Sequence, residues 1–153
     1  MILPPEILNQ IFLHSSYDDI NNWKDVIDPF IYTQKQHKTL IDTVKAGNLI
    51  GIKYHISCGA DIRVKDDYAL RYSAENGHID VVKYLVELGT NIHAVNDLAL
   101  IWSAQNGQLD VVKYLVGLGA NIHACNYYAL RQSAWYGHFD VVKYLAVQIL
   151  MML

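Results

Sequence analysis

The sequence repeats itself at one constant period without a gap, and this limits the chain to folds that stack copies of one unit. Three markers carry the period: Ala69, Ala99 and Ala129; Gly77, Gly107 and Gly137; Lys83, Lys113 and Lys143. A more divergent copy precedes them in phase, with Leu40, Gly47 and Tyr54 standing one full period before their counterparts. We therefore predict four repeats, at residues 37–66, 67–96, 97–126 and 127–153.

Each copy has the pattern of two short helices and a loop. The first helix is expected over residues 68–76, where Gly77 can end it without steric strain. The second is expected to begin at Asp80 and end at Gly89, with apolar residues at helical spacing between them. Helices this short are unstable alone and must pack on neighbouring copies. The predicted fold is an all-α solenoid of four helix-turn-helix repeats with a helical segment at residues 1–36.

The best-preserved part of the unit resembles the ankyrin repeat. The resemblance rests on N-G-H-I-D-V-V-K-Y-L-V-x-L-G-x-N-I-H-A at residues 76–94, on its close counterpart at 106–124, and on the A-L-x-x-S-A before each. Ankyrin repeats usually span about 33 residues and begin their first helix with T-P-L-H. In this chain the 30-residue unit begins that helix with Y-A-L-R or L-A-L-I. We expect the three missing residues to shorten the hairpin fingers and to leave fewer ordered strands.

The resemblance also implies where a partner protein binds, because ankyrin-like folds bind partners along a concave strip of first-helix positions. Positions whose residue differs between copies are not needed for packing the repeats together. The predicted strip consists of Tyr68, Arg71, Glu75, Asn76, Leu98, Gln105, Asn106, Tyr128, Arg131, Trp135 and Tyr136. Trp, Tyr and Arg are enriched in binding hot spots, so we expect Tyr128, Arg131, Trp135 and Tyr136 to be the anchors. The alternative for Trp135 is that it fills a gap at the end of the stack.

Residues 1–36 lie outside the repeats and begin with a helix-start pattern. One interpretation is a capping helix that covers the first repeat. The other is an F-box, which L-P-x-E-I-L-x-x-I-F at residues 3–12 and the later Trp23, Asp28-Pro29 and Phe30 resemble, although the middle stretch is short. That resemblance implies a ubiquitin-ligase role, in which the repeats recruit the substrate and a Skp1-type adaptor contacts Leu3, Pro4, Ile7, Leu8, Ile11 and Phe12. The combination is similar to the ankyrin proteins of giant DNA viruses.

The chain offers no pattern for catalysis, and we predict neither an enzyme nor a cofactor or metal site. Four of its seven histidines share repeat positions, His78 with His138 and His93 with His123, and so are spread along the stack rather than clustered as zinc ligands are. A net charge of −3 gives no general attraction to nucleic acid or anionic lipid. Without an apolar run of membrane-spanning length or a signal peptide, and with two free thiols expected at Cys58 and Cys125, we expect a cytoplasmic protein, in the host cytoplasm if viral.

Two expectations concern contacts on the second helices and at the end of the chain. Asp80 and Lys83, one turn apart, are expected to form an ion pair, as are their counterparts. The last copy continues as A-V-Q-I-L-M-M-L from Ala146, without a closing glycine. We expect a monomer, unless this apolar tail drives self-association. The alternative function is accordingly a structural or oligomer-forming ankyrin protein with no ubiquitin-ligase role.

Overall fold

The computed structural model describes residues 40–152, and the chain divides into two compact units, residues 1–62 and 63–153. In the first unit, the described part consists of helical residues 40–45 followed by α4 (Leu49–Ser57). The side chain of Asn48 caps α4 by accepting a hydrogen bond from the amide of Gly51 (2.9 Å). The buried apolar residues of this part are Leu40, Val44, Ile52, Tyr54 and Ile62. The predicted F-box residues lie outside the described residues.

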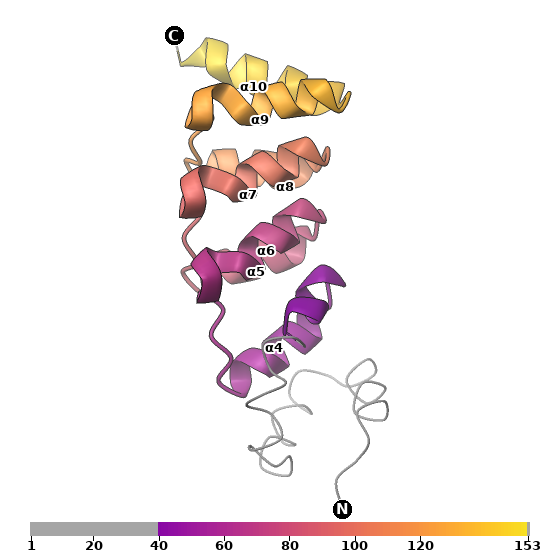
Figure 1. Cartoon of the computed structure of the whole chain (residues 1–153), viewed down its shortest axis with the longest axis vertical. Coiled ribbons are helices and arrows are strands. Elements are labelled where there is room, and N and C mark those ends of the chain that lie inside the picture. Colours follow the sequence, from indigo (N-terminus) through magenta and orange to yellow (C-terminus); the bar gives the residue numbers. More distant parts are fainter. Residues whose placement is uncertain (1–39, 153) are drawn as a thin grey trace, which may run out of the picture. The chain divides into compact units, whose positions relative to one another are not determined.

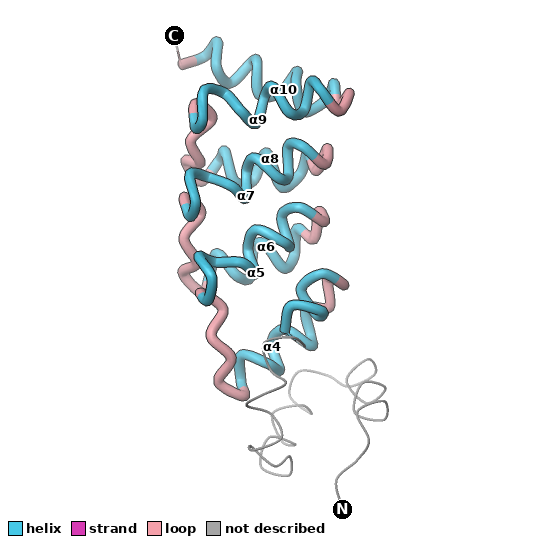
Figure 2. The backbone as a smooth tube through the Cα atoms, viewed as in Figure 1, coloured by secondary structure: helices cyan, strands magenta, loops and turns pink. Residues whose placement is uncertain are grey.

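The second unit is a stack of three helix pairs (Figure 1). The pairs are α5 (Val64–Glu75) with α6 (Ile79–Glu87), α7 (Ala94–Gln105) with α8 (Leu109–Gly117), and α9 (Ala124–Trp135) with α10 (Phe139–Met151). Helix α7 packs between α5 and α9. Loops return from one layer to the next along one edge (Figure 2). No strand occurs in residues 40–152, so the predicted all-α repeat fold is confirmed.

Apolar residues that do not change between copies form the core of this stack. Leu70 and Leu100 are completely buried, as are Val82 and Val112 on the second helices. A serine follows each first-helix leucine by three residues, and its hydroxyl donates to that leucine's carbonyl at 2.9 Å: Ser73 to Leu70, Ser103 to Leu100 and Ser133 to Leu130. This hydrogen bond satisfies a buried hydroxyl and lets the small side chain pack closely against the next layer.

A left-handed turn replaces the hairpin finger at the start of each first helix. Three consecutive non-glycine residues have positive φ, between 50° and 60°, in each helix pair of the second unit: Lys65, Asp66 and Asp67; Val95, Asn96 and Asp97; Cys125, Asn126 and Tyr127. The right-handed helix starts only at the following residue, Tyr68, Leu98 or Tyr128. This compact turn explains how the shortened unit closes without a hairpin, and it accounts for the absence of strands in residues 40–152.

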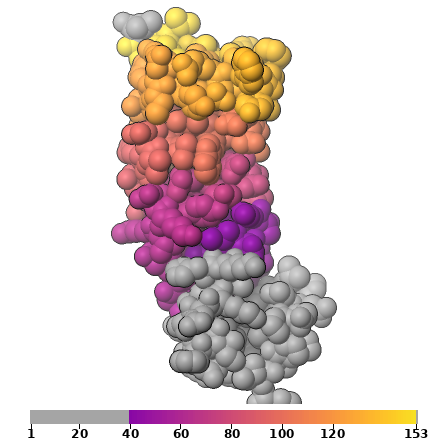
Figure 3. Space-filling model, viewed as in Figure 1, coloured from indigo at the N-terminus to yellow at the C-terminus, as the bar shows by residue number. Residues whose placement is uncertain are grey.

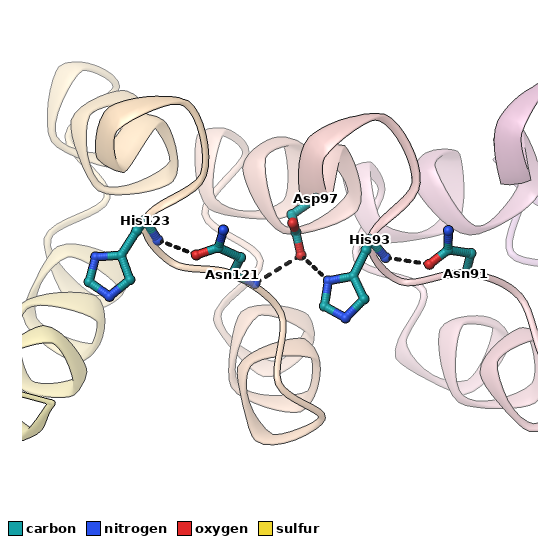
Figure 4. A network of polar contacts seen from close by, with 5 residues as sticks. All are labelled: Asn91, His93, Asp97, Asn121 and His123. Carbon is teal, nitrogen blue, oxygen red and sulfur yellow. Dashed lines mark hydrogen bonds and ion pairs between the residues drawn. The ribbon is translucent and has the colours of Figure 1, made fainter.

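Asp97 joins two layers through the polar network in Figure 4. Its buried carboxylate oxygen Oδ1 accepts from the backbone amide of Asn121 in the next return loop and contacts Nδ1 of His93, both at 2.8 Å. Asn91 and Asn121 occupy equivalent positions, and each side-chain oxygen accepts from the amide two residues later. The returns between layers are therefore held by side chains whose short reach suits a tight turn.

A second contact between layers uses the glycine that ends each first helix. A Cβ added to Gly107 would lie 2.5 Å from Nδ1 of the His138 ring. A Cβ added to Gly77 would meet the side chain of Gln108 in the same way. Both glycines have positive φ. The glycine thus provides the backbone conformation and the space for a side chain of the next layer, which gives this histidine position a structural role.

Candidate partner-binding surface

The first helices α5, α7 and α9 lie side by side and bring the variable first-helix positions onto one surface, which we call the α5–α7–α9 surface (Figure 1). Tyr68, Leu98 and Tyr128 occupy the same position in successive layers, where the right-handed helix begins, and all three are half-buried. The left-handed turn before them sets the direction in which each helix starts. The structure therefore places these three positions in successive layers of one surface.

An aromatic–arginine cluster, formed by Tyr68, Arg71, Tyr72 and Trp102, crosses the boundary between two layers. The Tyr68 and Tyr72 ring centroids lie 3.9 Å apart, and Tyr72 contacts Trp102 edge-on at 5.6 Å. The Arg71 guanidinium lies 5.7 Å from the Tyr68 ring centroid and 5.5 Å from that of Trp102. At these distances the cation–π interaction is attractive, and it holds the guanidinium of Arg71 against the two rings.

The backbone of the left-handed turn fixes Arg71. Its guanidinium donates to the carbonyl of Lys65 at 2.6 Å and to that of Asp66 at 3.1 Å. These two hydrogen bonds hold the guanidinium in one orientation, so the side chain does not rotate freely. The cluster is therefore ordered before any partner arrives, which lowers the entropy cost of binding.

The surroundings of Tyr68 affect the ionisation of its hydroxyl. Desolvation and a side-chain hydrogen bond with Tyr72 raise the pKa of Tyr68 to about 12, against a smaller opposing effect of Arg71. Because an ordinary tyrosine is already protonated at physiological pH, this shift leaves the charge of the cluster to Arg71.

A second arginine–tyrosine pair stands two layers further along the surface. The Arg131 guanidinium lies 5.3 Å from the centroid of the Tyr128 ring, and Arg131 is exposed. The equivalent position in the intervening layer is Ile101, which is buried, next to the half-buried Leu98. The surface therefore presents a positive, aromatic site at each end and an apolar segment between them.

The remaining predicted residues lie at the ends of the first helices. Asn76 and Asn106 each donate a side-chain hydrogen bond to the carbonyl four residues earlier, at 2.8 and 2.9 Å. Glu75 and Gln105 are half-buried. Trp135 is 85% exposed and Tyr136 55% exposed, so the alternative that Trp135 fills a gap is wrong.

The sequence prediction did not include two aromatic residues of the surface, Tyr72 and Trp102. They are equivalent to each other and to Gln132, so this position varies between copies as strongly as those that were chosen. The same criterion, variation within a conserved frame, would have found them. Their omission left out half of the aromatic–arginine cluster.

The described residues show no group of three His, Cys, Asp or Glu side chains that could hold a metal ion. Across residues 40–152 no helix combines the length and the apolar character needed to cross a bilayer. Cys58 and Cys125 are free thiols.

Paired helices in repeated layers, with an ordered aromatic surface on the first helices, define a helical-repeat protein of the kind that binds other proteins. The model of the family described as ankyrin repeats, in three copies, matches residues 40–126 and 96–150. The chain belongs to the ankyrin-repeat family, whose repeats form protein-interaction domains. No curated protein matches the chain.

Proposed function

We propose that this chain is a non-enzymatic scaffold that binds a protein partner on the α5–α7–α9 surface. The aromatic–arginine cluster carries the proposal, because Arg71 is fixed by two backbone hydrogen bonds and packs against rings from two layers. Tryptophan, tyrosine and arginine dominate binding hot spots, and an ordered arrangement loses little entropy when a partner docks. Tyr136, which is 55% exposed, extends this surface at its exposed end.

The charges on the surface indicate the chemistry of the partner. Arg131 is exposed, and its guanidinium can form paired hydrogen bonds with a carboxylate. The half-buried Leu98 offers an apolar contact between the two arginine–tyrosine pairs. A segment that carries an acidic side chain next to apolar ones fits this order of sites.

Affinity purification with the full chain tests this proposal, followed by binding measurements on the partner it identifies. Tyr128→Ala with Arg131→Ala should weaken binding by about tenfold or more, as loss of hot-spot residues does. Lys143→Ala is the matched control, because it removes an exposed positive charge from α10 rather than from the surface. Equal binding by the double variant and the unchanged chain would refute the proposed surface.

We further propose that the N-terminal segment docks a Skp1-type adaptor, so that the bound partner becomes a ubiquitin-ligase substrate in the cytoplasm. The F-box-like pattern at residues 3–12 supports the adaptor, and the free thiols fit a reducing compartment. A pull-down with a purified Skp1-type adaptor tests the role. We expect a complex that is lost when Leu3, Ile7 and Phe12 are changed to Ala together; no complex, or one that is unaffected by these changes, would leave a plain scaffold.

A further inference from the structure

Six positions of the last repeat carry larger apolar side chains than the copy before it, although Ile101, Trp102 and Leu118 are replaced there by Arg131, Gln132 and Gln148. Relative to the preceding copy the six replacements are Gln105 by Trp135, Asn106 by Tyr136, Leu109 by Phe139, Gly117 by Val147, Gly119 by Ile149 and Asn121 by Met151. All but Ile149 among the new residues are exposed. Chance variation on a solvated surface would favour polar side chains, so these exposed residues need an explanation.

Helix α10 also follows a path that the earlier second helices do not take. Helix α8 ends at Gly117, and Gly119, with φ of +94°, then begins the return to the next layer. Helix α10 runs through the equivalent positions, with Val147 and Ile149 inside it, and ends at Met151. The chain therefore does not turn back at these positions as it does after α8.

The exposed end presents residues that are buried in the earlier layers. Ala74 and Ala104 are completely buried, whereas the equivalent Ala134 is exposed, and Leu130 is only half-buried. We call this surface the end face; it consists of Leu130, Ala134, Trp135, Phe139, Leu150 and Met151. The two helices that form it, α9 and α10, close one end of the second unit in Figures 1 and 3.

The size and charge of the end face indicate what covers it. Trp135 is 85% exposed, Phe139 75%, Leu150 69% and Met151 76%. An aromatic side chain buries about 150–250 Å², so with the aliphatic residues the face approaches the roughly 800 Å² per partner of a stable interface. The part of the face at residues 145–151 carries no charged residue, whereas the exposed Asp140 and Lys143 follow Phe139 on the same helix. The most apolar interfaces are those of homodimers.

We propose that two copies of this chain dimerise through the end face, related by a two-fold axis, with α10 packing against α10 of the partner. A two-fold contact uses the same patch on both copies, so one apolar face is sufficient and the assembly closes at two. The dimer presents two α5–α7–α9 surfaces. A partner with two binding segments, or a partner that is itself dimeric, gains affinity from this pairing without any new contact.

Sedimentation equilibrium of the full chain over a range of concentrations tests the dimer. We expect a monomer–dimer equilibrium, and Leu150→Glu with Met151→Glu should raise its dissociation constant by about 100-fold or more, because the contact would bury unpaired charges on both copies. Leu118→Glu is the matched control, since Leu118 is an apolar residue 44% exposed at the end of α8. This control should leave the dissociation constant unchanged.

Circular dichroism checks that each variant keeps its helix content, and Phe139→Ala provides a milder second variant that should raise the dissociation constant by roughly tenfold. Three results overturn the proposal. They are a wild-type chain that stays monomeric at every concentration, a mass that continues to rise beyond the dimer, or a dimer that Leu118→Glu weakens as much as the end-face variants do. None of them bears on partner binding, which is measured separately with Tyr128 and Arg131.

Discussion

At the scale of single residues, Asp97 shows how one buried carboxylate can hold two layers together. Its Oδ1 accepts from the amide of Asn121 and contacts Nδ1 of His93. In Asp97→Ala these groups lose their acceptor, and we expect the free energy of unfolding to fall by about 2 kcal/mol. Asp97→Asn should lose less, because its amide oxygen can still accept.

Urea unfolding measures this loss, with Asp66→Ala as the control. Asp66 also has positive φ, at 56°, but is exposed. The control therefore carries the same backbone cost of alanine in a left-handed turn without breaking the bridge between layers. Equal losses in Asp97→Ala and Asp66→Ala would show that the bridge contributes nothing.

Gly107 and Gly137 form a second residue-scale comparison. Both have positive φ, 70° and 79°, but a Cβ on Gly107 meets the His138 ring whereas one on Gly137 meets nothing within 4 Å. We expect Gly137→Ala to cost about 1–2 kcal/mol for the left-handed backbone, and Gly107→Ala to cost about 1–3 kcal/mol more for the clash. Thermal or urea unfolding gives both values, and adding His138→Ala to Gly107→Ala should recover part of the difference.

At the scale of elements, the left-handed turn can be tested by a substitution that is normally harmful. Val95 is β-branched, 46% exposed and at φ 53°, a conformation that glycine adopts freely. We expect Val95→Gly to stabilise the chain by roughly 0.5 kcal/mol. Val147→Gly, at a similar 44% exposure inside the right-handed α10, should destabilise it by roughly 0.5–1 kcal/mol. The same sign for both changes in urea unfolding would contradict a left-handed turn at Val95.

The helices could be predicted from the sequence because their signals are local. Leu70, Val82 and Leu85 recur at helical spacing in a frame of fixed glycines, and all three are fully buried. The left-handed turns gave no such signal, since none of the three contains the glycine that usually marks positive φ. The left-handed turns arise because a shortened repeat must close without a hairpin. This closure is visible only in the folded chain.

Contacts between layers were harder to predict than those within a helix. Spacing along the chain suggested an ion pair between Asp80 and Lys83, but within residues 40–152 none joins them. Lys83 instead places its ammonium 6.0 Å from the ring centroid of Tyr114 in the next layer. Trp102 was missed for a related reason, because its role depends on Arg71 of the neighbouring layer. Contacts that cross layers are set by the stacking geometry, which a one-dimensional pattern does not contain.

At the scale of the whole molecule, the second unit behaves as an array in which each layer contacts its neighbours. Its layers repeat in the same phase as the sequence, and each boundary reuses the same kinds of contact, such as Gln108 over Gly77 and His138 over Gly107. An array of this kind should accept an additional layer, provided that the insertion preserves the period and the left-handed turn.

Inserting a second copy of residues 97–126 between Asn126 and Tyr127 tests this expectation. The junction reads Cys125, Asn126 and then a second Asp97, which restores a left-handed turn of the observed type. The new Asp97 again has an Asn121 amide in the following return, as in the existing layer.

We expect circular dichroism to show the added helix and urea unfolding to shift to a higher midpoint. The reason is that the insertion adds one buried boundary between layers while the two ends of the stack stay the same. The same insertion with three glycines added after Asn126 should lose this gain, since the longer return displaces the layer from its neighbours. If the insertions with and without the glycines stabilise the chain equally, or if both unfold it, the layers are not joined by the compact turn that distinguishes this unit.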